Sequence, residues 1–235
     1  MIKEALQYIV GLGNTEIFHE NGQSYSSQPV HLLEEPVASK LNVRSLSGLV
    51  EYLKSNFDSN ERIMVHVESP TEVSAFLQLN TNRNREYLIK ANALLPQFHF
   101  ENWYDPEEFN IKLQSAFVKN ADRDIVLRVV GNIREEDVKT FGDDGVSQSV
   151  TARVGVAQVG NVEVPNPVLL KPFRTFVEVD QPESNFVFRM KNGPRCALFE
   201  ADGGKWKLEA MQNIKKYLHS ALAKEIECKM IVIIA

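Results

Sequence analysis

The chain has 235 residues, of which 43% are hydrophobic and 24% are charged. This composition is that of an ordinary globular protein, which excludes general disorder and the need for a stabilising disulfide or metal. The formal net charge of −5 excludes a global attraction to phosphates. No segment approaches the roughly 20 apolar residues of a membrane-spanning helix, and the N-terminus lacks a signal-peptide pattern. We therefore expect a soluble, cytoplasmic protein with no membrane partner.

The first 60 residues predict a helix, a hairpin and a second helix. Apolar residues at helical spacing favour an amphipathic helix over 2–12, and Asn21-Gly22 between two short β-prone segments favours a hairpin over 15–27. Residues 28–44 are interpreted as an irregular connection. The second helix is expected from about residue 45, with Ser47 as the candidate cap. Its predicted buried face consists of Leu49, Val50, Leu53 and Phe57.

The middle of the chain predicts a meander followed by two helices. Three alternating segments, 62–68, 72–79 and 85–91, are joined by turn-rich sequences and are typical of antiparallel strands. Asp105-Pro106 then marks a helix start, because Asp can accept from the first turn and Pro presets its geometry. A second helix is expected over about 120–131.

The remaining sequence predicts strands and one long helix. A hairpin is expected over 136–154, with further strands at 162–164, 169–179, 186–190 and 195–200. Helical spacing of apolar residues continues from Lys205 to about Glu225, before a β-branched run at the C-terminus. We predict an α+β fold of mostly antiparallel sheet, with four to five packed helices, including a long C-terminal helix followed by a terminal strand. Residues 1–235 are interpreted as a single domain, with a subdivision near 133–145 as the alternative.

No catalytic motif occurs in the sequence. There is no P-loop, no nucleophile elbow and no dinucleotide-binding turn, and the five histidines are not at metal-ligand spacing. The two cysteines, Cys196 and Cys228, stand in apolar contexts and are expected to be buried thiols. We predict no cofactor, no metal and no catalytic residue, so that binding is favoured over enzymatic activity.

Two acidic groups provide an alternative to this interpretation. Carboxylates of Glu136, Asp143 and Asp144, or of the pair Glu200 and Asp202, could hold Mg²⁺ in a metal-dependent nuclease. A charged strand start and a polar turn explain the same residues without a metal. The structural interpretation is preferred, because no companion lysine stands at nuclease spacing.

Two segments interleave cations with aromatic residues, as single-stranded nucleic-acid sites do. The candidate nucleic-acid-binding residues are Arg83, Arg85, Tyr87, Lys171 and Arg174. This hypothesis predicts that the cations converge on one face with exposed aromatic rings. The acidic balance of the chain makes polar loops and core aromatics the preferred explanation.

The C-terminal run is uncharged and strongly β-prone. Left exposed, it would invite edge-to-edge association, so it must pair inside the domain or across a subunit interface. We therefore predict a homo-oligomer. The candidate interface residues are Met230, Ile231, Val232, Ile233 and Ile234.

A resemblance to a known protein family rests on four segments of the second half of the chain. They are Val150-Thr-Ala-Arg-Val154, the segment from Gly160 to Leu170, Pro172-Phe173 and Phe186-Val-Phe-Arg-Met190. These residues resemble phage and prophage proteins of the YfdQ-like family. The resemblance implies an accessory protein of a temperate phage and supplies no catalytic residue. We therefore expect an accessory protein that acts by homo-oligomeric assembly or binding. The alternatives are a single-stranded DNA-binding module, a metal-dependent nuclease and an antagonist of host immunity.

Overall fold

The computed structural model describes residues 2–20, 23–27, 37–81, 83–131, 141–143, 148–153, 159–191 and 195–235. Within these ranges the chain forms helices together with antiparallel and parallel strand pairs, which confirms the predicted α+β class. No helix in the same ranges is long and apolar enough to cross a membrane. The backbone divides into two compact units, Met1–Ala38 and Ser39–Ala235. Of the alternative boundary at 133–145, only residues 141–143 are described.

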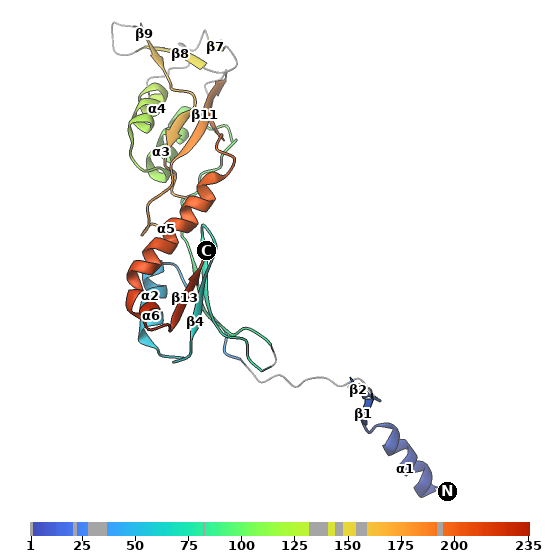
Figure 1. The fold of residues 1–235 in the computed structure, drawn as a ribbon. Helices are drawn as coiled ribbons and strands as arrows, with labels where there is room; N and C mark the ends of the chain where they lie inside the picture. The colour runs from blue at the N-terminus through green and yellow to red at the C-terminus, as the bar shows by residue number, and fades with distance from the viewer. Residues whose placement is uncertain are drawn as a thin grey trace. The chain divides into compact units, whose positions relative to one another are not determined.

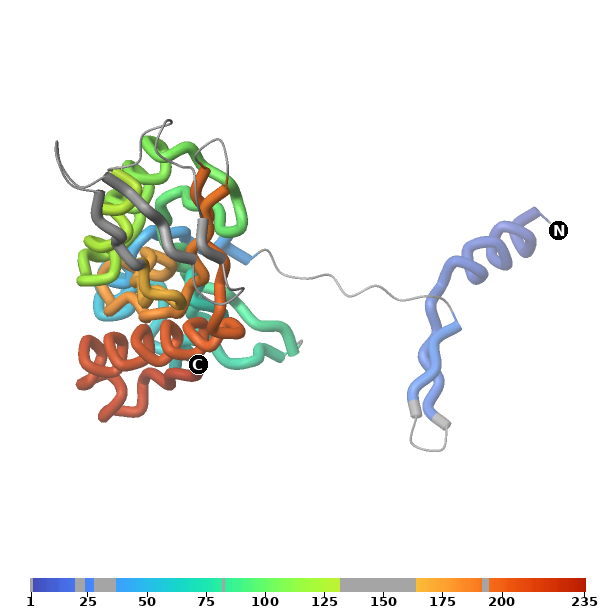
Figure 2. The backbone as a smooth tube through the Cα atoms, turned by 90° about the horizontal axis from the view of Figure 1, so that it is seen from above, coloured from blue at the N-terminus to red at the C-terminus, as the bar shows by residue number. Residues whose placement is uncertain are grey.

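The N-terminal unit consists of one helix and one hairpin, as predicted (Figure 2). α1 spans Ile2–Leu12, and β1 (Ile17–Glu20) pairs antiparallel with β2 (Gln23–Ser26). The Ser24 hydroxyl lies 2.9 Å from Nδ1 of His19 across the hairpin. No residue of α1 is buried. The described part of this unit therefore has no hydrophobic core of its own.

A five-stranded mixed sheet forms the first half of the larger unit (Figure 1). Its strands, in spatial order, are β13 (Ile231–Ile234), β4 (Ile63–Ser69), β5 (Glu72–Leu77), β6 (Tyr87–Asn92) and β3 (Leu41–Val43). β4, β5 and β6 form the predicted antiparallel meander. β13 and β3 run parallel to their neighbours, so the predicted terminal strand pairs inside the domain.

Three helices contact this sheet and lie on one side of it in Figure 1: α2 (Leu46–Ser55), α5 (Lys205–Ala221) and α6 (Ala223–Glu227). Alternate residues of β4 are buried, which places Val65 and Val67 in the core with Leu218 of α5. The helix predicted to run unbroken to Glu225 is instead interrupted at Leu222. Leu222 is fully buried, so the break packs into the same core.

The start and end of α2 differ from the prediction. Its cap is Ser45, whose Oγ accepts a hydrogen bond of 3.1 Å from the Gly48 amide, rather than Ser47. The helix ends at Ser55, because Asn56 adopts a left-handed conformation with φ of 48°. Phe57 therefore leaves the helical face and is 85% exposed, so its predicted burial was wrong.

A second sheet pairs β10 (Val168–Leu170), β11 (Ser184–Lys191) and β12 (Arg195–Glu200) in antiparallel order. α3 (Pro106–Ala116) contacts β12 and α4 (Ala121–Gly131) contacts β10. The core of this half is rich in aromatic rings: Phe98, Phe100, Tyr104, Phe109, Phe117, Phe186 and Phe188. The predicted cap of α3 is confirmed, since Asp105 Oδ1 accepts from the Glu108 amide at 2.8 Å.

The strand predicted over 169–179 stops at Leu170. Pro172 has no amide hydrogen to donate to a neighbouring strand. The backbone of residues 171–173 forms hydrogen bonds with the end of α3 and the residues that follow it instead. The Val118 amide donates to the Lys171 carbonyl at 2.8 Å, and the Phe173 amide donates to the Ala116 carbonyl at 2.9 Å. Residues 171–183 therefore form a connection that leads from β10 to β11, and we call it the 171–183 connection.

A third sheet joins β7 (Phe141–Asp143), β8 (Gln148–Arg153) and β9 (Val159–Glu163) in antiparallel order. Phe141 pairs with Val150, which confirms the hairpin predicted over 136–154 within its described residues. Residues 144–147 and 154–158, between these strands, lie outside the described ranges.

Candidate functional site

The five-stranded sheet has one face turned away from α2, α5 and α6, and we call it the open face. The strand registers place two rows of residues across it. One row consists of Ile234, His66, Ser74, Lys90 and Asn42, and the other of Val232, Met64, Phe76 and Tyr87. The first row is mainly polar and the second is apolar and aromatic. The open face therefore changes from polar to apolar along the strand direction.

Two cations lie over aromatic rings at the β6 side of the open face. The guanidinium carbon of Arg85 is 5.0 Å from the centroid of Phe76, and Nζ of Lys40 is 5.7 Å from the centroid of Tyr87. The two rings contact each other with centroids 5.1 Å apart. Phe76 is 4% exposed, whereas Tyr87 is 41% exposed. A ligand can therefore reach Tyr87, while Phe76 supports it from below.

An ion-pair triad occupies another part of the same face. Nζ of Lys90 lies 3.4 Å from Glu68 and 3.4 Å from Glu72. Burial of Lys90 opposes its charged form, but the carboxylates of Glu68 and Glu72 outweigh this and raise the pKa of its ammonium group. Lys90 therefore stays charged and neutralises acidic groups that would otherwise repel an anionic ligand.

Three of the predicted nucleic-acid-binding residues belong to this site. Arg83 and Arg85 are exposed in the loop between β5 and β6, and Tyr87 begins β6. Arg83 has a positive φ of 63°, and its amide donates to the Asn80 carbonyl at 2.8 Å, which fixes the loop. Lys40, next to β3, was not predicted. The parallel pairing of β3 with β6 brings it to Tyr87, and this pairing has no local sequence signal.

The other two predicted residues have partners elsewhere. Arg174 is 6% exposed, and its Nη1 lies 2.6 Å from Glu200 Oε1. Its guanidinium carbon is 3.9 Å from the centroid of Trp206. Its side chain is therefore enclosed by the protein and is not available to a nucleic acid at the surface. Lys171 is partly exposed and lies 3.4 Å from Glu183.

The Arg174 cluster is a structural network of the larger unit. The Ser184 hydroxyl accepts from Nη2 of Arg174 and donates to Asp202 Oδ2 at 2.6 Å. The Gln181 side chain accepts from the Arg174 amide at 2.9 Å and donates to the Phe176 carbonyl at 2.9 Å. Glu200 and Asp202, proposed above as alternative metal ligands, are thus engaged with Arg174 and Ser184.

No group of three or more His, Cys, Asp or Glu residues in the described ranges is placed to hold a metal ion. Glu136 and Asp144 lie outside those ranges, and Asp143 is described only as a strand residue. The nuclease alternative therefore stays an untested hypothesis for that acidic cluster.

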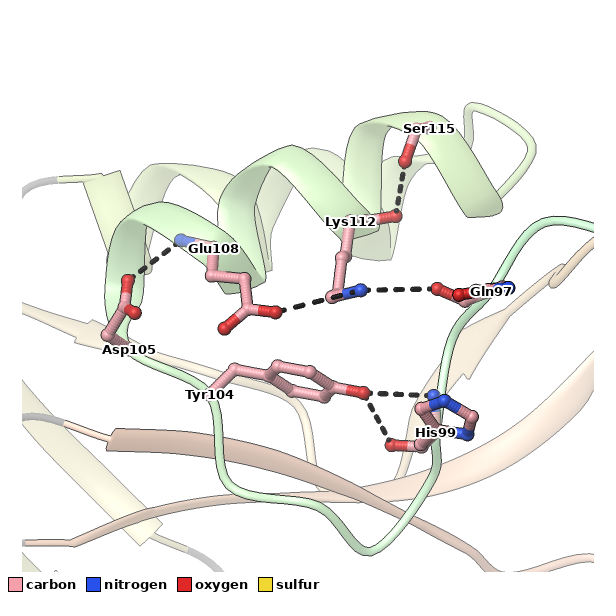
Figure 3. A network of polar contacts seen from close by, with 7 residues as sticks. All are labelled: Gln97, His99, Tyr104, Asp105, Glu108, Lys112 and Ser115. Atoms are coloured by element: carbon pink, nitrogen blue, oxygen red, sulfur yellow. Dashed lines mark hydrogen bonds and ion pairs between the residues drawn. The ribbon is translucent and has the colours of Figure 1, made fainter.

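A further polar network surrounds the start of α3 (Figure 3). The Tyr104 hydroxyl accepts from the His99 amide at 2.9 Å and donates to the His99 carbonyl at 3.1 Å. Lys112 donates to the Gln97 carbonyl at 3.3 Å and pairs with Glu108 at 3.6 Å. These bonds fasten residues 97–104 to α3. His99 participates through its backbone, so the network has no catalytic geometry.

A polar cavity of about 270 Å³ lies between the 171–183 connection and α5. Its lining combines both signs of charge: Glu178, Val179, Asp180, Asn213, Lys216 and Tyr217. Burial, followed by the charges of Glu178 and Glu51, raises the pKa of the Tyr217 hydroxyl. Ligand pockets are typically larger and mostly apolar. This cavity therefore offers less to a ligand than the open face does.

The apolar surface of the N-terminal unit is a second candidate surface. The stripe of α1, which we call the α1 stripe, consists of Ile2, Leu6, Ile9 and Val10, with exposed fractions of 81%, 57%, 62% and 66%. In the hairpin, Ile17, Phe18 and Tyr25 are also more than half exposed. Such a run of apolar residues is typical of a surface that another molecule covers.

The predicted interface residues of the C-terminal strand have two environments. Ile231 and Ile233 are 3% and 9% exposed and belong to the core under the helices. Met230 and Ile234 are 38% and 40% exposed, and Val232 is partly exposed. No described strand pairs with the outer edge of β13. A subunit interface at this edge stays a prediction.

Comparison with protein-family models, with curated proteins and with solved structures finds no match to this chain. The resemblance to the YfdQ-like family therefore remains a hypothesis from the sequence. The fold and the surfaces define an α+β protein with two exposed candidate binding surfaces, and its function is inferred from their chemistry.

Proposed function

We propose that this chain is a non-enzymatic accessory protein of a phage or prophage that acts as a homo-oligomer, assembled through its N-terminal unit. The observation that carries the assembly is the exposure of the α1 stripe, whose four residues are each more than 50% exposed. The phage setting is supported by the resemblance of residues 150–190 to the YfdQ-like family.

The two elements of the N-terminal unit are too small to be stable alone. α1 has 11 residues, and isolated helices shorter than about 12–15 residues are marginal in water. A single two-stranded hairpin is marginal for the same reason, since it buries little apolar surface. Contact with another molecule would supply the missing burial. The unit is therefore suited to form its final packing only in an assembly.

A second copy of the same unit is the occupant that this surface fits best. α1 carries one cation and one anion, Lys3 and Glu4, so two copies neither repel one another nor require a charged partner. Facing stripes of Ile2, Leu6 and Ile9 can pack as ridges into grooves. A symmetric pair uses the same patch on both copies, so a single apolar stripe is sufficient.

Light scattering coupled to size exclusion tests the proposal on the full chain. We expect a defined oligomer, which Leu6→Asp converts to a monomer because two carboxylates would be buried at the contact. Gly11→Asp is the matched control, because residue 11 lies on the opposite side of the helix from the stripe, has open space for a side chain, and adds the same charge. The control should keep the oligomer, and in both variants the larger unit, which has its own core, should unfold at the same temperature as in the parent. A monomeric parent chain, or equal masses for both variants, would contradict the proposal.

A further inference from the structure

Three basic residues near Tyr87, which are Lys40, Arg83 and Arg85, have no carboxylate partner within the described part of the chain. Lys90, by contrast, forms ion pairs with Glu68 and Glu72. These three cations are exposed, in a chain whose net charge is −5. Lys40 lies over Tyr87 and Arg85 over the adjoining Phe76, while Arg83 stands two residues before Arg85 in the same loop. Uncompensated positive charge is thus concentrated at one end of one sheet.

We propose that the open face binds single-stranded nucleic acid, with one base stacked on Tyr87 and phosphates held by Lys40, Arg83 and Arg85. This inference is independent of the proposed homo-oligomer. Exposed rings on a sheet, bordered by cations, bind single strands because every base has a stacking face and every linkage a negative charge. The three cations therefore favour a polyanion as the ligand, and the exposed ring of Tyr87 favours one that also carries aromatic rings.

The packing of the site favours a single strand over a duplex. Tyr87 rests against Phe76 with centroids 5.1 Å apart, so its ring is held while 41% of the residue remains exposed. A base can cover that ring only when it is unstacked from its neighbours, as in a single strand. Nζ of Lys40 is 5.7 Å from the same ring and can move to a phosphate when a base takes its place.

Fluorescence anisotropy with a labelled 20-nucleotide oligo-dT tests the site on the full chain between 50 and 200 mM NaCl. Three phosphate contacts predict a slope of log K against log salt of about −2, or affinity falling about 15-fold over this range. Arg85→Gln should reduce the magnitude of the slope by about 0.7, because one contact is lost. Arg195→Ala is the control, since Arg195 is an exposed arginine of β12 on the other sheet.

Tyr87 is tested by a pair of variants. Tyr87→Phe keeps the ring and should bind like the parent, whereas Tyr87→Leu keeps apolar contact with Phe76 but loses stacking and should bind about tenfold more weakly. Circular dichroism confirms that each variant is folded. The proposal is overturned by no binding at 50 mM NaCl, by equal binding of Tyr87→Leu and Tyr87→Phe, or by a 20-base-pair duplex that binds as tightly as the single strand. The homo-oligomer is tested by solution mass and nucleic-acid binding by anisotropy, so a negative result for one proposal does not contradict the other.

Discussion

Glu178 Oε1 accepts a hydrogen bond of 2.8 Å from the backbone amide of Leu46, 132 positions earlier in the chain. The same oxygen accepts from the Ser47 amide at 3.2 Å. A carboxylate at this point satisfies donors that the first helical turn cannot pair itself, and it interacts favourably with the helix dipole. Nearby, the Thr175 hydroxyl donates to the Pro70 carbonyl at 2.5 Å. The 171–183 connection therefore fastens α2 and the β4–β5 turn.

Glu178→Ala should lower the free energy of unfolding by about 1–2 kcal/mol, because both amides lose their acceptor. Glu178→Gln should cost less, since an acceptor oxygen remains and only the charge is lost. Urea denaturation measures both changes. Asp180→Ala, at the exposed neighbouring acid, is the control and should stay within about 0.5 kcal/mol of the parent. Equal effects of the two alanine variants would contradict the capping role.

Arg174→Ala should destabilise the chain by about 3–5 kcal/mol, the range expected when one partner of a buried ion pair is removed. Glu200 and Ser184 would lose their guanidinium partner, and Trp206 would lose the group stacked on it. Urea denaturation followed by tryptophan fluorescence reports the change. Lys171→Ala is the control, because its ion pair with Glu183 is partly exposed and worth little. A change below about 1 kcal/mol for Arg174→Ala would show that the cluster does not hold the fold together.

Asp202 gives this cluster a defined pH dependence. Partial burial of Asp202 favours its neutral form, but hydrogen bonds from Ser184 and Gly204 and the charge of Arg174 lower its pKa below the ordinary value of an aspartate. A depressed folded-state pKa adds stability above the unfolded value, and this contribution is lost as the pH falls through the folded value. We expect Asp202→Asn to flatten the fall of unfolding free energy below pH 4. An unchanged slope would contradict this assignment.

Local sequence signals predicted most of the elements but not how distant segments pair. The predictions of α1, of the hairpin strands β1 and β2 and of the Asp105 cap each depend on a few adjacent residues, and each is confirmed. β3 has three residues, and its parallel pairing with β6 depends on tertiary contacts, so it was interpreted as loop. The burial of Phe57 was wrongly predicted because the apolar spacing does not indicate that Asn56 adopts a left-handed conformation and ends the helix.

The candidate site was predictable only in part for the same reason. Arg83, Arg85 and Tyr87 are neighbours in sequence, and Arg85 and Tyr87 both lie against Phe76 in the structure. Lys40 joins them through strand pairing. The segment around Arg174 showed the same alternation of cations and aromatic rings, yet there the arginine is buried against Trp206 and Glu200. Composition does not distinguish a cation over an exposed ring from a cation inside a core.

The two cysteines should differ sharply in reactivity. Cys196 is fully buried, and burial together with the charge of Asp105 raises the pKa of its thiol to about 12. Cys228 is exposed, so its predicted burial was wrong: the residue follows α6 and lies outside the core. Native protein should therefore react with one equivalent of a thiol reagent quickly and with the second only in denaturant. Cys228→Ser should abolish the fast phase, and a fast phase that persists in this variant would contradict the assignment.

Two residues of the C-terminal strand test separately whether β13 serves the core or a subunit interface. Ile231→Ala should cost about 2–4 kcal/mol in unfolding free energy, because its side chain is 3% exposed beneath the helices. Ile234→Lys should leave stability nearly unchanged, since Ile234 is 40% exposed at the end of β13. If the outer edge of β13 pairs with a second copy, Ile234→Lys should also reduce the solution mass, because lysines at an edge oppose strand pairing. A reduced mass here with no change in Leu6→Asp would move the subunit interface from α1 to β13, whereas the reverse would leave β13 as a core strand alone.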